Sequence, residues 1–235
     1  MSSAPRWYTS LAKIISEHDK SSLFLCATVD ASSKPHVRSM IHRGFLTSDA
    51  RPTLPLLLAS TDGRAPKVSQ ITHSTHVELA WWIDSTKDQF RISGHARIVP
   101  SPDLTSSPTF SAEPTPAEYT GILALDAEHF DWEAKRREMF DQVSEHMRAS
   151  WCRPTPGSVL KGGYEEMNDW PTSVKKPSDA RTEEEKRLSA EALRNYALVV
   201  IEPVEVDWVQ MGIVPNHRTR FTRDGDGWKE DPIVP

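Results

Sequence analysis

The feature that most constrains the fold of this chain is a series of short apolar runs, most of them separated by only a few polar turn residues. The runs occupy residues 23–29, 36–46, 54–59, 77–83, 89–99, 196–201, 204–211 and 218–222. Strands joined by short turns pair antiparallel, because a parallel connection needs a crossover of about a dozen residues or more. The sequence therefore predicts a mainly β fold of the α+β class, an antiparallel barrel or sheet with flanking helices.

Segments with helical periodicity flank the predicted strands. Trp7, Leu11 and Ile14 recur at the spacing of one helix face and predict a helix over about 5–18. Helical patterns also cover 131–151 and the charged segment 183–194, and a short helix can begin at Pro66. Residues 100–117 contain five prolines and many Ser and Thr, which is typical of an irregular connection. We expect irregular inserts at about 100–130 and 158–190.

The composition excludes several classes of protein. No apolar stretch approaches the roughly 20 residues of a membrane span, and the first 20 residues lack the apolar core of a signal peptide. Two cysteines are too few for a disulfide scaffold or a structural zinc site. A net charge of −5 argues against binding nucleic acid through bulk electrostatics. We therefore expect a cytoplasmic protein with neither a membrane nor a nucleic acid as partner.

The motifs of several common active sites are absent from the sequence. It contains no Gly-rich dinucleotide fingerprint, no phosphate-loop spacing around Gly157 and no nucleophile-elbow serine. His73 and His76 stand three residues apart without a third ligand, so we expect no metal site. Cys26 lies in an apolar run and is expected to be buried, and Cys152 has no base to activate it.

The remaining residues with chemical interest are cations in a chain that is acidic overall. Arg38 and Arg43 stand five apart on one predicted strand, so their side chains should lie on opposite faces. The other cations of this series are Arg64, Lys67, Arg91, Arg218 and Arg220. Arg64 and Lys67 follow the hydroxyls of Ser60 and Thr61, and Arg91 follows the neutral Gln89 on the same predicted strand. Each cation alone could face solvent or pair with one of the 33 acidic residues. Together they indicate an anion-binding groove suited to a phosphate.

Four segments, in the order found here, also carry a family resemblance. They are Ala27-Thr-Val-Asp30 with Arg38-Ser-Met-Ile-His-Arg43, Ser60-Thr-Asp-Gly-Arg64-Ala-Pro-Lys67, Trp81-Trp82 with Gln89-Phe-Arg-Ile-Ser-Gly94, and Asn195-Tyr-Ala-Leu with Arg220-Phe, Trp228 and Pro235. The chain resembles the pyridoxamine 5′-phosphate oxidase-like, FMN-binding split-barrel proteins, in particular the branch known only as an FMN-binding domain. The resemblance covers most of the chain outside 100–130 and 158–190.

The resemblance implies one domain over 1–235, a six-stranded antiparallel split β-barrel that forms a homodimer with FMN at the subunit interface. Carried over by position, Arg38 would bind the FMN phosphate and Lys67 would add a second cation. The other residues expected at the cofactor are Ser39, Met40, Ile41, Arg43, Ser60, Thr61, Arg64, Gln89 and Arg220. Gln89 would reach the flavin from the opposite subunit, and the segment 146–148 aligns with a helix that approaches FMN across the dimer.

The implied function is that of an FMN-dependent oxidoreductase acting on a small molecule of unknown identity, without a catalytic residue that can be named. Two departures separate the chain from the true oxidase. Asn216-His217-Arg218 stands where that enzyme grips its substrate's phosphate with an Arg-x-His pair, and Arg43 stands where it usually has a lysine. The alternatives are a non-catalytic flavin carrier or sensor, a structural dimer that has lost flavin, and a genuine pyridoxamine or pyridoxine phosphate oxidase.

Overall fold

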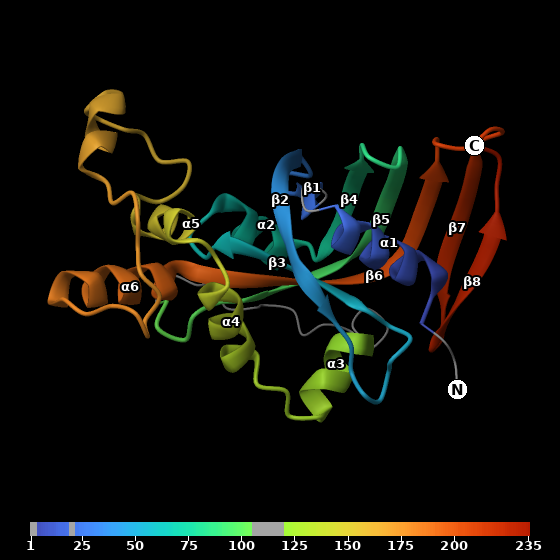
Figure 1. Cartoon of the computed structure of the whole chain (residues 1–235), viewed down its shortest axis with the longest axis horizontal. Coiled ribbons are helices and arrows are strands. Elements are labelled where there is room, and N and C mark those ends of the chain that lie inside the picture. Colours follow the sequence, from blue (N-terminus) through green and yellow to red (C-terminus); the bar gives the residue numbers. More distant parts are fainter. Residues whose placement is uncertain (1–3, 19–21, 105–119) are drawn as a thin grey trace.

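The computed structural model describes residues 4–18, 22–104 and 120–235, and its centre is one antiparallel sheet (Figure 1). The strands are β1 (Leu23–Val29), β2 (Pro35–Leu46), β3 (Leu56–Asp62), β4 (His76–Ile83), β5 (Asp88–Val99), β6 (Tyr196–Gln210), β7 (His217–Asp224) and β8 (Gly227–Pro232). Their order in the sheet is β3-β2-β1-β4-β5-β6-β7-β8, and β3 also pairs with β6. That additional pairing closes the first six strands into a barrel, which confirms the predicted fold, while β7 and β8 extend the sheet beyond it.

The inner face of the barrel is filled by alternate residues of each strand. On β1, Phe24 and Cys26 are buried while Leu23 and Leu25 are exposed, so the period of two is retained although both faces are apolar. Trp81 from β4 and Phe90 from β5 are aromatic side chains that are fully buried in this core. Cys26 is fully buried, as predicted.

Strand β3 and the first half of β6 are buried on both faces. Leu57 and Ala59 face the barrel core, whereas Leu56 and Leu58 pack into a second core beneath the helices. This double burial explains why the sequence there is a continuous apolar run rather than an alternating one. The strand itself begins at Leu56 and extends to Asp62, later than the predicted 54–59.

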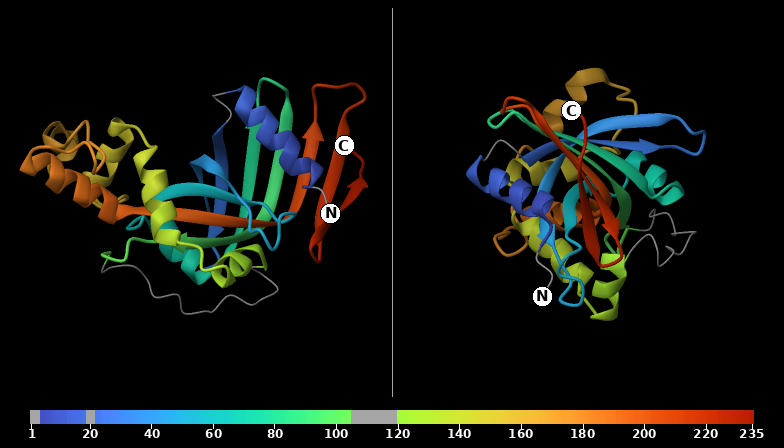
Figure 2. Two further views of the ribbon diagram at one scale, coloured as in Figure 1. Left: turned by 60° about the horizontal axis from the view of Figure 1, so that its bottom comes forward. Right: turned by 90° about the vertical axis from the view of Figure 1, so that its right-hand side faces the viewer.

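The helices are α1 (Arg6–Glu17), α2 (Pro66–His73), α3 (Thr120–Ala127), α4 (Trp132–Asp141), α5 (Glu145–Ala149) and α6 (Glu183–Asn195), with short 3-10 turns η2 (Ser150–Cys152) and η3 (Gly163–Asp169). Helices α4, α5 and α6 gather at one end of the sheet, and the β7–β8 hairpin lies at the other (Figure 2). The prediction of one helix over 131–151 was wrong, because the chain leaves α4 after Asp141 and starts α5 with Ser144 as its N-cap. None of the described helices is long and apolar enough to cross a membrane.

Two further differences from the predicted elements result from contacts between distant parts of the chain. The two strands expected at 196–201 and 204–211 are one strand, β6, which passes through Pro203 at a β-bulge opposite Gly94. A Cβ on Gly94 would lie 2.3 Å from the Glu202 carbonyl oxygen, so the close approach requires glycine. Within the expected insert at 100–130, α3 forms because the buried Glu202 carboxylate accepts the amides of Gly121 and Ile122 at 2.8 and 3.0 Å. Residues 105–119 of that insert lie outside the described part of the chain.

Candidate functional site

Arg38 and Lys67 come together at the end of the barrel where α2 packs against β1. The Arg38 guanidinium donates to Thr28 Oγ1 and to Gln70 Oε1, both at 2.7 Å, and to the Cys26 carbonyl oxygen at 3.1 Å. Lys67 Nζ donates to Thr61 Oγ1 at 2.9 Å. Neutral oxygens therefore orient both cations, and within the described residues no ion pair joins either of them to a carboxylate.

The electrostatics of this corner favour an anion. Burial lowers the pKa of Lys67, and the nearby charge of Arg38 lowers it further. The thiol of Cys26 beneath them does not supply the missing charge, because burial raises its pKa to about 11. Two neighbouring cations in a partly desolvated site cost free energy unless an anion balances them. The corner is thus suited to an anion such as a phosphate, and binding of the FMN phosphate by Arg38 and Lys67 remains a prediction.

Arg43 and Ser60 lie on the other side of the sheet from Arg38, which confirms the predicted opposite faces. Arg43 Nε donates to Ser60 Oγ at 3.0 Å, close to the buried ring of Tyr196. Burial lowers the pKa of Arg43 and raises that of Tyr196 to about 12. The phenol is therefore neutral at physiological pH, and Arg43 keeps its charge without a carboxylate in the described residues.

Arg64 has a different environment from the other predicted cofactor residues. Its guanidinium forms a two-pronged ion pair with Asp62, at 2.9 and 2.7 Å, and donates to the Arg153 carbonyl oxygen at 3.0 Å. This geometry fixes the segment after η2 against β3. A role of Arg64 at the cofactor remains a prediction.

The strand register places four other predicted cofactor residues on the outer face of the sheet. Ser39 pairs with Leu25, Leu25 with Ala80, and Ala80 with Arg91, so these side chains share one face. The same alternation brings Ile41, Gln89 and Arg220 to that face, whereas Met40 points into the core and is buried. Ser39 and Ile41 lie on β2 at one side of this face, and Arg220 lies on β7 at the other.

Thr28 and Gln70 were not predicted as site residues. Both are buried, and the Thr28 hydroxyl also donates to Gln70 Oε1 at 2.7 Å. Their neutral oxygens give no motif that could be recognised in the sequence. In the predicted segment 146–148, Arg148 is buried and donates to the Val174 carbonyl oxygen at 2.9 Å, so it holds a loop in place.

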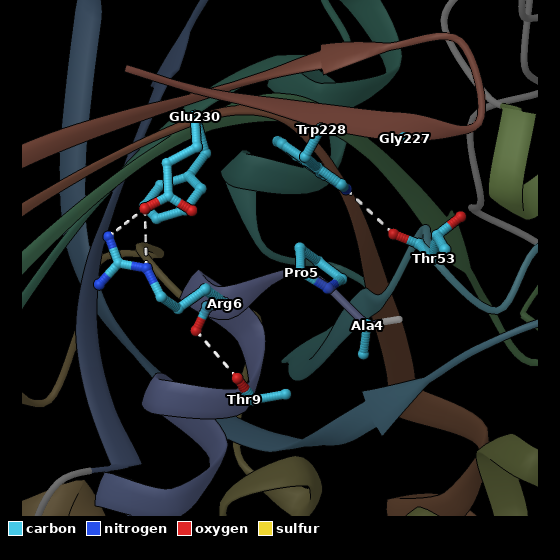
Figure 3. A pocket seen from close by; sticks show the side chains of 9 residues that line it. Ala4, Pro5, Arg6, Thr9, Thr53, Gly227, Trp228 and Glu230 are labelled. Carbon is cyan, nitrogen blue, oxygen red and sulfur yellow. Dashed lines mark hydrogen bonds and ion pairs between the residues drawn. The ribbon is translucent and has the colours of Figure 1, made fainter. Parts of the chain in front are cut away.

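A separate cavity of about 390 Å³ lies between the start of α1 and β8 (Figure 3). Arg6 Nε donates to Glu230 Oε1 at 2.8 Å across it, and Trp228 Nε1 donates to the Thr53 carbonyl oxygen at 3.0 Å. Its lining contains none of the predicted cofactor residues. No cluster of three or more metal-ligating side chains is found in the part of the chain that the structure describes.

Comparisons with known proteins show which sequences and folds this chain is similar to. Residues 4–100 match the family model of the pyridoxamine 5′-phosphate oxidase FMN-binding domain. The pyridoxine/pyridoxamine 5′-phosphate oxidase 2 of Arabidopsis thaliana is 23% identical over 222 residues, which are 92% of this chain and 88% of that protein. A pyridoxamine 5′-phosphate oxidase-related, FMN-binding protein from Nostoc punctiforme has a TM-score of 0.67 and 22% identity, with both chains covered completely. PhzG from Burkholderia lata, solved with tetrahydrophenazine-1-carboxylic acid, has a TM-score of 0.57 and 15% identity over 98% of this chain and 89% of that one.

Residues 4–100 are therefore similar to the FMN-binding domain of the pyridoxamine 5′-phosphate oxidase family, and the chain has the split-barrel fold of the FMN-binding protein from Nostoc punctiforme. The cofactor that this domain implies is FMN. The Arg38–Lys67 corner fits the group, because FMN ends in a phosphate and the corner offers two cations and neighbouring hydroxyls.

Proposed function

We propose that this protein is an FMN-dependent oxidoreductase that holds the FMN phosphate with Arg38 and Lys67 and acts on a small molecule. The observation that supports the proposal is the juxtaposition of these cations, which are oriented by Thr28, Gln70 and Thr61 without a carboxylate counter-ion in the described residues. A planar guanidinium can donate to two phosphate oxygens, and the lysine adds a compact charge.

Bound FMN supplies the hydride chemistry, so the chain's own residues have to bind and orient the cofactor. The Arg38 side chain is fixed by four neutral acceptors before any ligand arrives, which reduces the entropy lost on binding. Partial burial strengthens the attraction between these cations and an anion, because less water screens it. No acid or base is assigned to the reaction.

The experiment that tests this function begins with the absorption spectrum of the purified protein and identification of the released flavin. The FMN-loaded protein is then mixed anaerobically with NADH or NADPH and afterwards with candidate acceptors. An oxidoreductase is expected to show reduction of the flavin and reoxidation by a substrate. Stable FMN binding without turnover by any donor or acceptor would instead favour the carrier or sensor alternative.

Proteins of this family generally form dimers, and the outer face of the barrel supports a homodimer for this chain. Its β2–β1–β4 half carries several exposed apolar side chains beside the polar Ser39 and Glu78: Val37 is 66% exposed and Trp82 is 44% exposed, with Leu23 and Leu25 between them. Six neighbouring strands of about seven residues cover roughly 600 Å² of planar area. The side chains make the accessible surface larger than this planar area, so the face approaches the roughly 800 Å² that each partner buries in a stable interface. We propose that a second copy covers it and brings its Gln89 to the flavin.

Diluting the protein below its dimer dissociation constant is expected to weaken FMN binding, because a monomer would hold only part of the site. The measurement is sedimentation velocity with detection at a flavin wavelength over a dilution series. Val37→Glu should shift the transition to higher protein concentration, since it places a charge among the apolar side chains of the face. A monomer that retains one tightly bound FMN would contradict the shared site.

The second candidate function is oxidation of pyridoxine or pyridoxamine 5′-phosphate, the activity for which the Arabidopsis relative is named. We expect this reaction to be slow or undetectable. The Arg-x-His pair is absent, and Arg218 at that place is bound to Asp207 at 3.0 and 2.7 Å. Each missing charged hydrogen bond costs about 1.5–3 kcal/mol, or roughly 10- to 150-fold in affinity. Steady-state assays that find about one turnover per second with micromolar substrate would overturn this expectation.

A further inference from the structure

Next to Lys67 the structure contains a cavity of about 430 Å³ whose far wall comes from the segment after α5. Thr61 and Lys67 line it from β3 and α2, while Trp151, Arg153 and Trp170 line it from that segment. The cavity is therefore continuous with one of the two cations of the proposed phosphate site. It is built from parts of the chain more than 80 residues apart in sequence.

Arg153 is held firmly at this wall but has an unsatisfied donor. Its carbonyl oxygen accepts from Arg64, which is itself paired with Asp62, so the backbone at this position is tied to β3. Its guanidinium carbon lies 5.8 Å from the centroid of the Trp170 ring. Its Nε is buried and has no hydrogen-bond partner among the described residues. A buried N–H without an acceptor is unfavourable, and an anionic ligand is one group that would satisfy it.

The charges around the cavity define the kind of ligand. Asp62 also lines it, but this carboxylate is neutralised by Arg64. Lys67 and Arg153 are then the charges without an ion-pair partner in the described residues, and together they carry two positive charges. A phosphate monoester carries nearly two negative charges at pH 7. The match favours such a dianion over a carboxylate with a single charge.

We infer that Arg153 is a further phosphate-binding residue, which completes with Lys67 the site for the terminal phosphate of FMN. The inference rests on the proposed placement of that phosphate and adds a residue that the sequence motifs did not indicate. Arg153 and Trp170 both line the cavity, and the Trp170 ring lies beside the guanidinium. Arg64 acts as a positioning residue by fixing the Arg153 backbone.

The test compares the affinities of the apoprotein for FMN and for riboflavin, which lacks the phosphate, by quenching of flavin fluorescence. Arg153→Ala is expected to weaken FMN binding about ten- to a hundredfold and to leave riboflavin binding unchanged. Arg153→Lys should retain part of the FMN affinity, because it keeps the charge but not the fork. Arg181→Ala removes an exposed arginine elsewhere and should change FMN affinity by no more than about twofold. Thermal melting of each variant reports whether the fold is intact.

The outcomes separate this inference from the proposed function. If Arg153→Ala binds FMN like the parent while Lys67→Ala loses affinity, the inference is wrong and the phosphate site stands. If neither variant nor Arg38→Ala loses affinity, the proposed placement of the phosphate fails as well. An equal loss for riboflavin would show that Arg153 only supports the fold, and would overturn its role as a ligand. Binding of inorganic phosphate to the FMN-loaded protein that Arg153→Ala abolishes would assign the residue to a substrate's phosphate instead, and would also overturn the inference.

Discussion

Replacing Arg38 with alanine is expected to weaken FMN binding by about 2–4 kcal/mol, or roughly 30- to 1000-fold, in a protein that still folds. The substitution removes two charge-assisted hydrogen bonds to the phosphate and leaves that dianion underpaired. The fold should tolerate it, because the present partners of Arg38 are neutral oxygens, those of Cys26, Thr28, His36 and Gln70. Calorimetric titration of the apoprotein with FMN measures the effect.

Lys67 and riboflavin provide the controls for this prediction. Lys67→Ala should cost less, about 1.5–3 kcal/mol, because the lysine contributes one compact charge rather than a planar fork. Riboflavin should bind the parent and both variants about equally weakly, which separates loss of a phosphate contact from damage to the barrel. An Arg38→Ala variant that folds normally and binds FMN as tightly as the parent would place the phosphate elsewhere.

The barrel could be predicted from local patterns because each strand carries its own signal. The turn at 30–34 and the alternation in 77–83 predict β1, β2 and β4 within one or two residues. Where burial is decided by distant parts of the chain, the prediction failed. The join of 196–201 and 204–211 into one strand depends on Gly94 allowing close approach of Glu202. The break after Asp141 has a local cause that the prediction missed, because Ser144 caps a new helix. β8 carries mostly polar residues on an edge strand, so its period is weak.

The candidate site was only partly accessible from the sequence. Arg38 and Lys67 were identified by motif, yet their proximity follows from α2 packing against β1, which no local pattern contains. Arg64 is an arginine like Arg38 and lies close to Lys67 in the sequence, but it is paired with the carboxylate of Asp62 two residues earlier. Arg153 lies in an unremarkable Pro-rich segment, and only the folded chain brings it to the Lys67 cavity. Sequence patterns thus give residue chemistry, whereas the tertiary structure determines which charges lack a partner.

His42, beside Arg43 on β2, introduces a pH dependence of stability that no sequence pattern predicts. Its ring is only 8% exposed and lies 4.4 Å from the ring of Phe45 and 5.2 Å from that of Trp81, between centroids. Its Nδ1 is buried without a hydrogen-bond partner among the described residues. Burial, and to a smaller extent the charge of Arg43, lowers the pKa of His42 to about 4. The folded protein therefore holds this imidazole neutral at pH values where an unfolded chain protonates it.

Acidification from pH 6.5 to about 4 is expected to lower the free energy of unfolding by up to about 3 kcal/mol through His42 alone. In this interval the unfolded chain binds a proton at His42 that the folded protein does not, so stability falls as pH falls, at most by about 1.4 kcal/mol per pH unit. Urea unfolding of the apoprotein across this range, at one protein concentration, gives the parent slope. His42→Phe keeps an aromatic ring against Phe45 and Trp81 and removes the titrating nitrogen, so its slope should be shallower by about one proton. Subtracting one slope from the other cancels the contributions of every other titrating group. A change in packing that is independent of pH alters the free energy of unfolding but not its slope against pH. Parallel pH profiles for parent and variant would mean that His42 has the same pKa in the folded protein as in the unfolded chain, which would contradict the effect of burial described above.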